Sequence, residues 1–321
     1  MTELRRYLGM VNQLSKFSPN LAEITQPLKE LLLKNKEWVW DSPQQMALDQ
    51  IEKALVSSPI LALFDANLET IVSADASAYG LGAVLLQRQH SGDLKPVAYI
   101  SRSMTPTEQR YAQIEKEALA FTWACERLSD YLVGKEFHIQ TDHKPLVPLF
   151  SSRHLEELPI RVQRFRLRMM RFQFTISHVP GKELLIADTL SRAPATSPIT
   201  ADRQLQEETN AYVRMVVQSL PATEQRLREI KHLQAQDSVC QRVCEFCQTE
   251  WPQDKKSIDP TILPYYKRAT ELSVEEGLLM RGNRIIIPPS LRRDMLARIH
   301  TGHQGIVKCR EELDRVCGGL E

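Results

Sequence analysis

The chain has 321 residues, more than one ordinary hydrophobic core holds, so its length favours two or three domains. With 42% hydrophobic residues, 25% charged residues and a formal net charge of +1, the composition is that of a globular protein and excludes a disordered or polybasic chain. The apolar runs are far shorter than the roughly 20 residues that cross a bilayer, and six scattered cysteines do not make a disulfide scaffold. We therefore expect an intracellular protein, cytoplasmic or nuclear, with no membrane partner.

The first 66 residues predict a small helical unit. Leu4, Leu8 and Val11 recur at helical spacing, and Ser42-Pro43 is a typical helix start. The predicted helices cover residues 2–17, 21–33 and 44–56.

Residues 67–194 change to a β-rich pattern that alternates with helices. Strands are predicted over 69–74, 81–86, 96–100, 137–141 and 174–177. Helices are predicted over 107–132, 159–172 and 185–192, with a short one from Lys144-Pro145. The element order predicts one α/β domain with a mixed five-stranded sheet and flanking helices.

The stretch that follows is small and polar, beginning APATSP at 193–198, and predicts a linker over 195–222. A helical pattern resumes near Thr223. Residues 223–321 are therefore expected to form a separate, mostly helical segment.

Four acids occupy positions where an apolar core is expected. Asp75 and Asp142 each end an apolar strand, Glu117 lies at the edge of the apolar stripe of its helix, and Asp188 interrupts an apolar run. Glu115, two residues before Glu117, is expected to point to solvent. An acid at a strand end is ordinarily a turn or helix cap. Clustered acids instead need raised pKa values or a divalent cation, and Mg²⁺ prefers such oxygen ligands.

The local sequences around these acids resemble the ribonuclease H motifs of gypsy-type LTR retrotransposon Pol polyproteins. The matching segments, in order, are SADASAYGLGAVL (73–85), YAQIEKEALA (111–120), TDHKPL (141–146), PGKE (180–183) and ADTLSR (187–192). Residues 1–66, with LRRYLGM from Leu4, are similar to the end of the reverse transcriptase region. One departure is Leu184, where the family usually has Asn.

The resemblance implies a ribonuclease H-like fold and a metal-dependent endonuclease that hydrolyses the RNA strand of an RNA/DNA hybrid. It implies that Asp75, Glu117, Asp142 and Asp188 are catalytic and hold two Mg²⁺ or Mn²⁺ ions. His178 would assist proton transfer or product release, with a surface histidine near a turn as the alternative. The polymerase portion of the same polyprotein would be a partner.

A locally basic stretch, with no acid between Leu158 and Lys182, contains five arginines. We expect Arg161, Arg164 and Arg168, together with Lys144, to bind nucleic-acid phosphates. The alternative is a solvated helix face whose other side packs in the core.

The segment from Leu278-Leu279 through Lys308, which includes HTGHQG at 300–305, resembles the start of the zinc-binding domain that precedes the integrase core. Residues 223–321 are therefore expected to be a truncated form of this zinc-binding region. His300 and His303 would be the first pair of zinc ligands. The expected Cys-x-x-Cys pair is absent downstream, so Zn²⁺ binding is doubtful.

Two alternatives to an active nuclease stay open. One is a noncatalytic nucleic-acid-binding or inert remnant of a decayed retroelement. The other is an aspartic protease, which Asp75-Ala76-Ser77 disfavours because it lacks the glycine of that catalytic turn.

Overall fold

A computed structural model describes residues 2–14, 21–33, 38–55, 61–249, 251–252, 254 and 258–300. The chain divides into two compact units, each described by itself. Unit 1 comprises Met1–Thr105, Ala120–Lys144 and Arg171–Pro198, and unit 2 comprises Pro106–Leu119, Pro145–Met170 and Ile199–Glu321. Helix α5 (Gln113–Arg127) is continuous through the division, which falls after Leu119.

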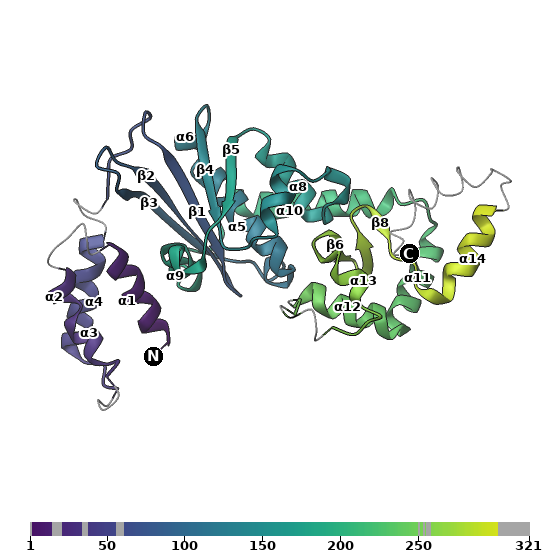
Figure 1. Cartoon of the computed structure of the whole chain (residues 1–321), viewed down its shortest axis with the longest axis horizontal. Coiled ribbons are helices and arrows are strands. Elements are labelled where there is room, and N and C mark those ends of the chain that lie inside the picture. The colour runs from purple at the N-terminus through teal and green to yellow at the C-terminus, as the bar shows by residue number, and fades with distance from the viewer. Residues whose placement is uncertain are drawn as a thin grey trace. The chain divides into compact units, whose positions relative to one another are not determined.

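Unit 1 is built on a mixed sheet with the strand order β3-β2-β1-β4-β5. Its strands are β1 (Thr70–Ala76), β2 (Gly80–Arg88), β3 (Leu94–Ser103), β4 (Glu136–Thr141) and β5 (Gln173–His178). The first three strands pair antiparallel, whereas β4 pairs parallel with both β1 and β5. Figure 1 shows these strands side by side with α9 (Leu185–Arg192) against them. The predicted mixed five-stranded α/β sheet is confirmed.

The strands of unit 1 form where apolar and small residues recur. All seven residues of β1 are buried, which is the pattern of a central strand covered on both faces. The remaining helices of unit 1 are α1 (Thr2–Leu14), α2 (Leu21–Ile24), α3 (Gln26–Glu30), α4 (Ser42–Leu55), α6 (Ser129–Leu132) and the short 3₁₀ helix η4 (Gly181–Glu183).

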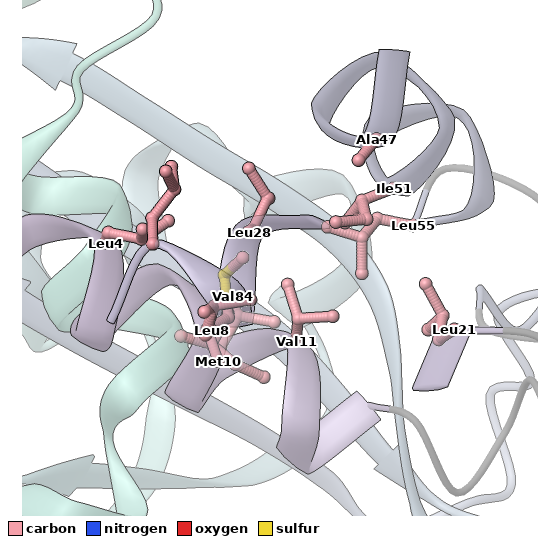
Figure 2. Packing of buried hydrophobic residues seen from close by; sticks show 12 residues of the cluster. Leu4, Leu8, Met10, Val11, Leu21, Leu28, Ala47, Ile51, Leu55 and Val84 are labelled. Atoms are coloured by element: carbon pink, nitrogen blue, oxygen red, sulfur yellow. The ribbon is translucent and has the colours of Figure 1, made fainter. Parts of the chain in front are cut away.

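Helices α1 to α4 share a hydrophobic core with the sheet. Leu8 and Val11 of α1 and Ile51 of α4 pack in one cluster with Val84 of β2 and Ile186 of α9. Figure 2 shows the labelled side chains of this cluster pointing toward one another. Full burial of such a side chain contributes about 1.5 to 3 kcal/mol. The boundary predicted at residue 66 is therefore not a boundary between compact units.

Unit 2 combines the amino-terminal part of α5 with helices and a small sheet from later in the chain. Its helices are η2 (Glu108–Arg110), α7 (Leu146–Ser151), η3 (Leu155–Glu157), α8 (Ile160–Met169), α10 (Thr200–Gln218), α11 (Glu224–Gln236), α12 (Ser238–Gln248), α13 (Leu263–Tyr266), η6 (Ala269–Glu271) and α14 (Pro289–His300). Strands β6 (Leu272–Glu275), β7 (Leu278–Arg281) and β8 (Arg284–Ile285) form an antiparallel sheet.

The predicted linker over 195–222 is wrong for most of its length. Residues 200–218 form α10, and Val213, Val216 and Val217 of this helix are buried in one cluster with Ile160 of α8. The polar residues around these valines concealed an amphipathic helix. The predicted domain 67–194 is also divided, because its residues 106–119 and 145–170 cluster with unit 2.

The single helix predicted over 107–132 is also wrong, since η2, α5 and α6 occupy this stretch as three separate helices. No helix among the described residues is long and apolar enough to cross a membrane.

Candidate metal centre

Asp75 and Asp142 are brought together by the parallel pairing of β1 with β4. The register places Ser73 opposite Gln140, and the Ser73 hydroxyl donates a 2.9 Å hydrogen bond to Oε1 of that glutamine. Asp75 and Asp142 each lie two residues further along. Because parallel neighbours end at the same edge of a sheet, the two carboxylates lie beside each other.

Glu117 joins these two aspartates from α5. Asp75, Glu117 and Asp142 each offer one carboxylate oxygen, and the three oxygens all lie within 4.8 Å of one another. In the part of the chain that the structure describes, this is the one such group of acidic, histidine or cysteine side chains. Gln113, one turn earlier, donates a 2.6 Å hydrogen bond from Nε2 to Oε1 of Glu117. The structure thus brings three of the four predicted acids together.

Asp75 is the most deeply buried aspartate of the cluster, with 6% of its surface exposed. The pKa of Asp75 is raised from 3.8 to about 6, chiefly by burial and also by the nearby charges of Asp188 and Asp142, against a hydrogen bond from Ser191. That bond runs from Oγ of Ser191 to Oδ2 of Asp75 and is 2.6 Å long. Without a metal, it is therefore energetically unfavourable for all the acids of the cluster to be ionised at once.

Asp142 lies at an exposed position at the end of β4. Partial burial raises the pKa of Asp142, the charge of Asp188 adds to the rise, and a backbone hydrogen bond and His178 oppose it. His178 ends β5 opposite Thr141, which immediately precedes Asp142. A Cβ atom at Gly181 would lie 3.1 Å from Oδ2 of Asp142, so the loop before α9 passes close to this carboxylate.

Asp188, the fourth predicted acid, lies outside the 4.8 Å group but close enough to act on the charges of Asp75 and Asp142. Its Oδ1 accepts a 2.8 Å hydrogen bond from Nε of Arg192, and its Oδ2 lies 3.8 Å from Nε of Arg6 on α1. Two arginines therefore offset the charge of Asp188.

Leu184 replaces the polar residue expected before the last acid. Its side chain is buried, with 2% of its surface exposed, and its carbonyl accepts a 3.0 Å hydrogen bond from the backbone N–H of Asp188. This loop is thus anchored by burial rather than by a polar side chain.

Three arginines of the basic helix α8, Arg161, Arg164 and Arg168, form ion pairs with acids of the same chain. Arg161 lies between two buried acids, with NH1 3.2 Å from Oε1 of Glu115 and 2.8 Å from Oε2 of Glu275. The guanidinium also stacks 4.7 Å from the ring centroid of Tyr111. The prediction that Glu115 points to solvent is wrong, because its side chain is 2% exposed. The predicted phosphate contact of Arg161 stays a prediction, and its side chain is 16% exposed.

The other predicted phosphate ligands differ in their surroundings. NH2 of Arg164 lies 2.6 Å from Oε2 of Glu208 on α10, and Arg168 pairs with the same oxygen at 2.5 Å. Lys144 lies at an exposed position two residues after Asp142. The nucleic-acid role of these residues stays a prediction, and Arg164 and Arg168 already have an acidic partner within the chain.

The predicted zinc ligands lie beyond what the structure describes, because His303 and the side chain of His300 fall outside the described residues. Cys240, Cys244 and Cys247 of α12 belong to or border a hydrophobic cluster with Leu272. Burial raises the pKa of each of these three thiols. We therefore assign them to the core of unit 2.

Sequence reasoning missed three polar residues around the acids: Ser191, Arg192 and Arg6. The signal for the first two was their spacing, since residues three and four positions after Asp188 share its face of a helix. Arg6 had no such signal, because it reaches Asp188 from a helix more than 180 residues earlier in the chain.

Comparison with known proteins found a matching family model and several similar relatives. Residues 40–139 match the family model described as an RNase H-like domain found in reverse transcriptase. The chain is 36% identical over 191 residues to the retrovirus-related Pol polyprotein from transposon 297 of Drosophila melanogaster, covering 59% of this chain and 17% of the relative. It is also 36% identical over 205 residues to the Tf2-3 transposon polyprotein of Schizosaccharomyces pombe, covering 63% and 15%.

Two solved structures were also found to be similar. One is the foamy viral protease-reverse transcriptase dRH in complex with double-stranded DNA, with a TM-score of 0.46 at 24% identity over 55% of this chain and 34% of the other. The second is RNase H1 from Halobacterium salinarum NRC-1, with a TM-score of 0.31 at 17% identity over 39% and 98%.

This chain carries an RNase H-like domain of the kind found in reverse transcriptases. The chain is similar to a segment of transposon Pol polyproteins, and it spans less than a fifth of the length of the curated relatives it matches.

Proposed function

We propose that this chain is a metal-dependent endonuclease that hydrolyses the RNA strand of RNA/DNA hybrids. The observation that carries the proposal is the convergence of Asp75, Glu117 and Asp142 to within 4.8 Å. Neighbouring carboxylates repel one another, and the raised pKa values of Asp75 and Asp142 express that cost together with burial. Without a bound metal, the repulsion among these carboxylates would only lower the stability of the sheet that bears Asp75 and Asp142.

The residues present fit a divalent cation of the Mg²⁺ or Mn²⁺ kind. All three are carboxylates, and hard cations prefer oxygen ligands of this type over nitrogen or sulfur. Asp75, Glu117 and Asp142 would hold the metal, and Asp188 would complete the set by turning from Arg192. When bound, such ions activate water and stabilise the charge that develops on phosphate oxygens.

The chain's own side chains supply the remaining requirements. His178 lies near Asp142 at the end of β5, and it would take up or deliver a proton during hydrolysis. Lys144 is exposed two residues from Asp142 and would contact a backbone phosphate of the hybrid. Gly181 leaves space beside the Asp142 carboxylate that any larger residue would narrow.

The experiment is cleavage of a hybrid with a labelled RNA strand by the full chain, with and without Mg²⁺ or Mn²⁺. We expect metal-dependent cutting of the RNA strand and none of the DNA strand. Asp142→Asn should abolish it, whereas Asp130→Asn, an exposed acid of α6, should not. Hybrid binding without cutting at any metal concentration would refute the proposal and favour a noncatalytic remnant.

A further inference from the structure

The Ser191 side chain lies at the base of the acidic cluster and is fully buried. Its hydroxyl reaches two acceptors, Oδ2 of Asp75 at 2.6 Å and the carbonyl oxygen of Asp188 at 2.9 Å. A bond to a backbone carbonyl one turn earlier is ordinary for a helical serine. The shorter contact to Asp75 is not, because it joins residues 116 positions apart and ends on a carboxylate.

The backbone of β2 is shaped to admit this serine. A Cβ atom at Gly82 would lie 2.3 Å from the backbone nitrogen of Ser191, and one at Gly80 would lie 2.2 Å from its carbonyl oxygen. Any side chain at either position would push α9 away from the strand. The two glycines therefore set the distance at which the Ser191 hydroxyl meets Asp75.

A third contact fixes the same segment of α9. The Ser77 hydroxyl donates a 2.8 Å hydrogen bond to the carbonyl oxygen of Ser191 and accepts one of 2.9 Å from the backbone N–H of Gly80. The turn between β1 and β2 thus holds the carbonyl of Ser191, while Asp75 at the end of β1 accepts from its side chain. Strand, turn and helix are joined around one residue.

We propose that Ser191 is a positioning residue of the metal centre, a role that rests on the proposed nuclease function. By holding Oδ2, its hydroxyl fixes the rotation of the Asp75 carboxylate and so the direction in which this carboxylate offers its lone pairs to a divalent cation. Residues that orient metal ligands in this way typically account for about 10- to 100-fold in metal affinity or activity. Ser191 does not itself touch the metal or the substrate.

The test compares variants of the full chain that differ by one hydroxyl. Ser191→Ala removes the bond to Asp75, and Ser191→Cys keeps the size of the side chain with a weaker donor. Ser191→Thr retains the hydroxyl but adds a methyl group at a fully buried site. The matched control is Thr189→Val, because the Thr189 hydroxyl on the same helix donates to the carbonyl oxygen of Leu185, at 2.7 Å, and to no acid among the described residues.

The first readout is binding of Mn²⁺ alone, measured by calorimetry well below the melting temperature of each variant. We expect Ser191→Ala to weaken binding about tenfold, with Ser191→Cys intermediate. Ser191→Thr should bind within about twofold of the parent even if it melts at a lower temperature, and Thr189→Val should match the parent. A merely structural serine would give the opposite result, in which metal affinity follows melting temperature.

The second readout is the Mg²⁺ concentration that gives half-maximal cleavage. Ser191→Ala should raise this Mg²⁺ concentration by a larger factor than the factor by which it lowers the cleavage rate at saturating Mg²⁺. The positioning role is overturned if Ser191→Ala binds Mn²⁺ as tightly as the parent. It is also overturned if Thr189→Val loses as much Mn²⁺ affinity as Ser191→Ala. A parent chain that binds Mn²⁺ without cutting overturns the nuclease function alone, and one that binds no Mn²⁺ overturns both.

Discussion

Two groups of acids each include one buried glutamate of α5, Glu115 in one and Glu117 in the other, and the two groups differ in how their negative charge is offset. Glu115 lies with Glu275 on either side of Arg161, so a guanidinium offsets the two carboxylates. Glu117 lies with Asp75 and Asp142, three acids whose ligand oxygens converge. A buried acid with an arginine is a structural element, whereas converging acids are the arrangement that a cation would stabilise. The two groups therefore differ in whether an arginine within the chain neutralises the carboxylates, rather than in how deeply the glutamates of α5 are buried.

The largest expected effect is on catalysis, from removal of one converging acid. Asp142→Asn should lower the cleavage rate by more than about 100-fold, since residues that merely support metal ligands already account for about 10- to 100-fold. The same change removes a like charge, so the metal-free protein should unfold at an equal or higher urea concentration. Single-turnover cleavage and urea denaturation measure the two. A variant that loses stability while it keeps cleaving would break the comparison.

Removal of the compensating arginine should act mainly on stability. Arg161→Met leaves Glu115 and Glu275 buried without their cation and should lower the free energy of unfolding by about 3 to 5 kcal/mol. Urea denaturation of the metal-free chain measures this change. Arg242→Met is the control, because Arg242 forms an exposed pair with Glu245 and should change stability by less than about 1 kcal/mol. Equal losses for the two variants would contradict a special role for the buried arginine.

The pH dependence of stability offers a third comparison, without metal. The pKa of Asp75 in the folded protein is about 6, above its ordinary value of 3.8, so protonation favours the folded state. This contribution is fully present below about pH 4 and is lost as the pH rises through 6. Its size is on the order of 3 kcal/mol, because one pKa unit corresponds to about 1.4 kcal/mol.

The measurement is urea denaturation of the metal-free parent and of Asp75→Asn between pH 4 and 7. The parent should lose stability relative to Asp75→Asn as the pH rises, and Mg²⁺ should reduce that loss. Parallel pH curves for the two proteins would show that Asp75 ionises in the folded state as it does in the unfolded chain.

The smallest expected effect concerns Glu208, which serves two arginines of α8 near the protein surface. Glu208→Gln should lower the free energy of unfolding by no more than about 1 kcal/mol, because solvent screens pairs of this kind. Urea denaturation at low and at high salt checks this, and the effect should shrink with added salt. If Glu208→Gln lowered the free energy of unfolding as much as Arg161→Met, Glu208 would have to be regarded as a buried structural acid like Glu115 and Glu275.

The regular part of the fold could be predicted because its residues repeat with a clear period. Helix α9 has the predicted bounds, Leu185–Arg192, and the five strands lie within a few residues of those expected. Three of the four acids converge, as the motif order implied. Helix α10 was missed because its first half is mostly polar and follows a stretch that contains Pro194 and Pro198.

The partners of individual charged residues could not be predicted, since they depend on contacts between distant parts of the chain. Glu115 looked solvent-facing from its helical position, but Glu275, 160 residues later, lies with it on Arg161. The spacing of apolar residues along a helix indicates its buried face only when the helix packs against the rest of the protein on one side. Helix α5 has two buried faces, so its second face carried no distinct pattern.

The hydrogen bond between Ser191 and Asp75 also bears on when the centre becomes complete during synthesis. It joins the first strand of unit 1 to the last helix, across 116 positions. Contacts of such long sequence separation form late and slow the folding of a domain. A nascent chain released or truncated before Asp188 would contain Asp75, Glu117 and Asp142 but neither Asp188 nor Ser191. Biosynthesis itself thus delays the assembly of the metal centre until the whole domain has been made.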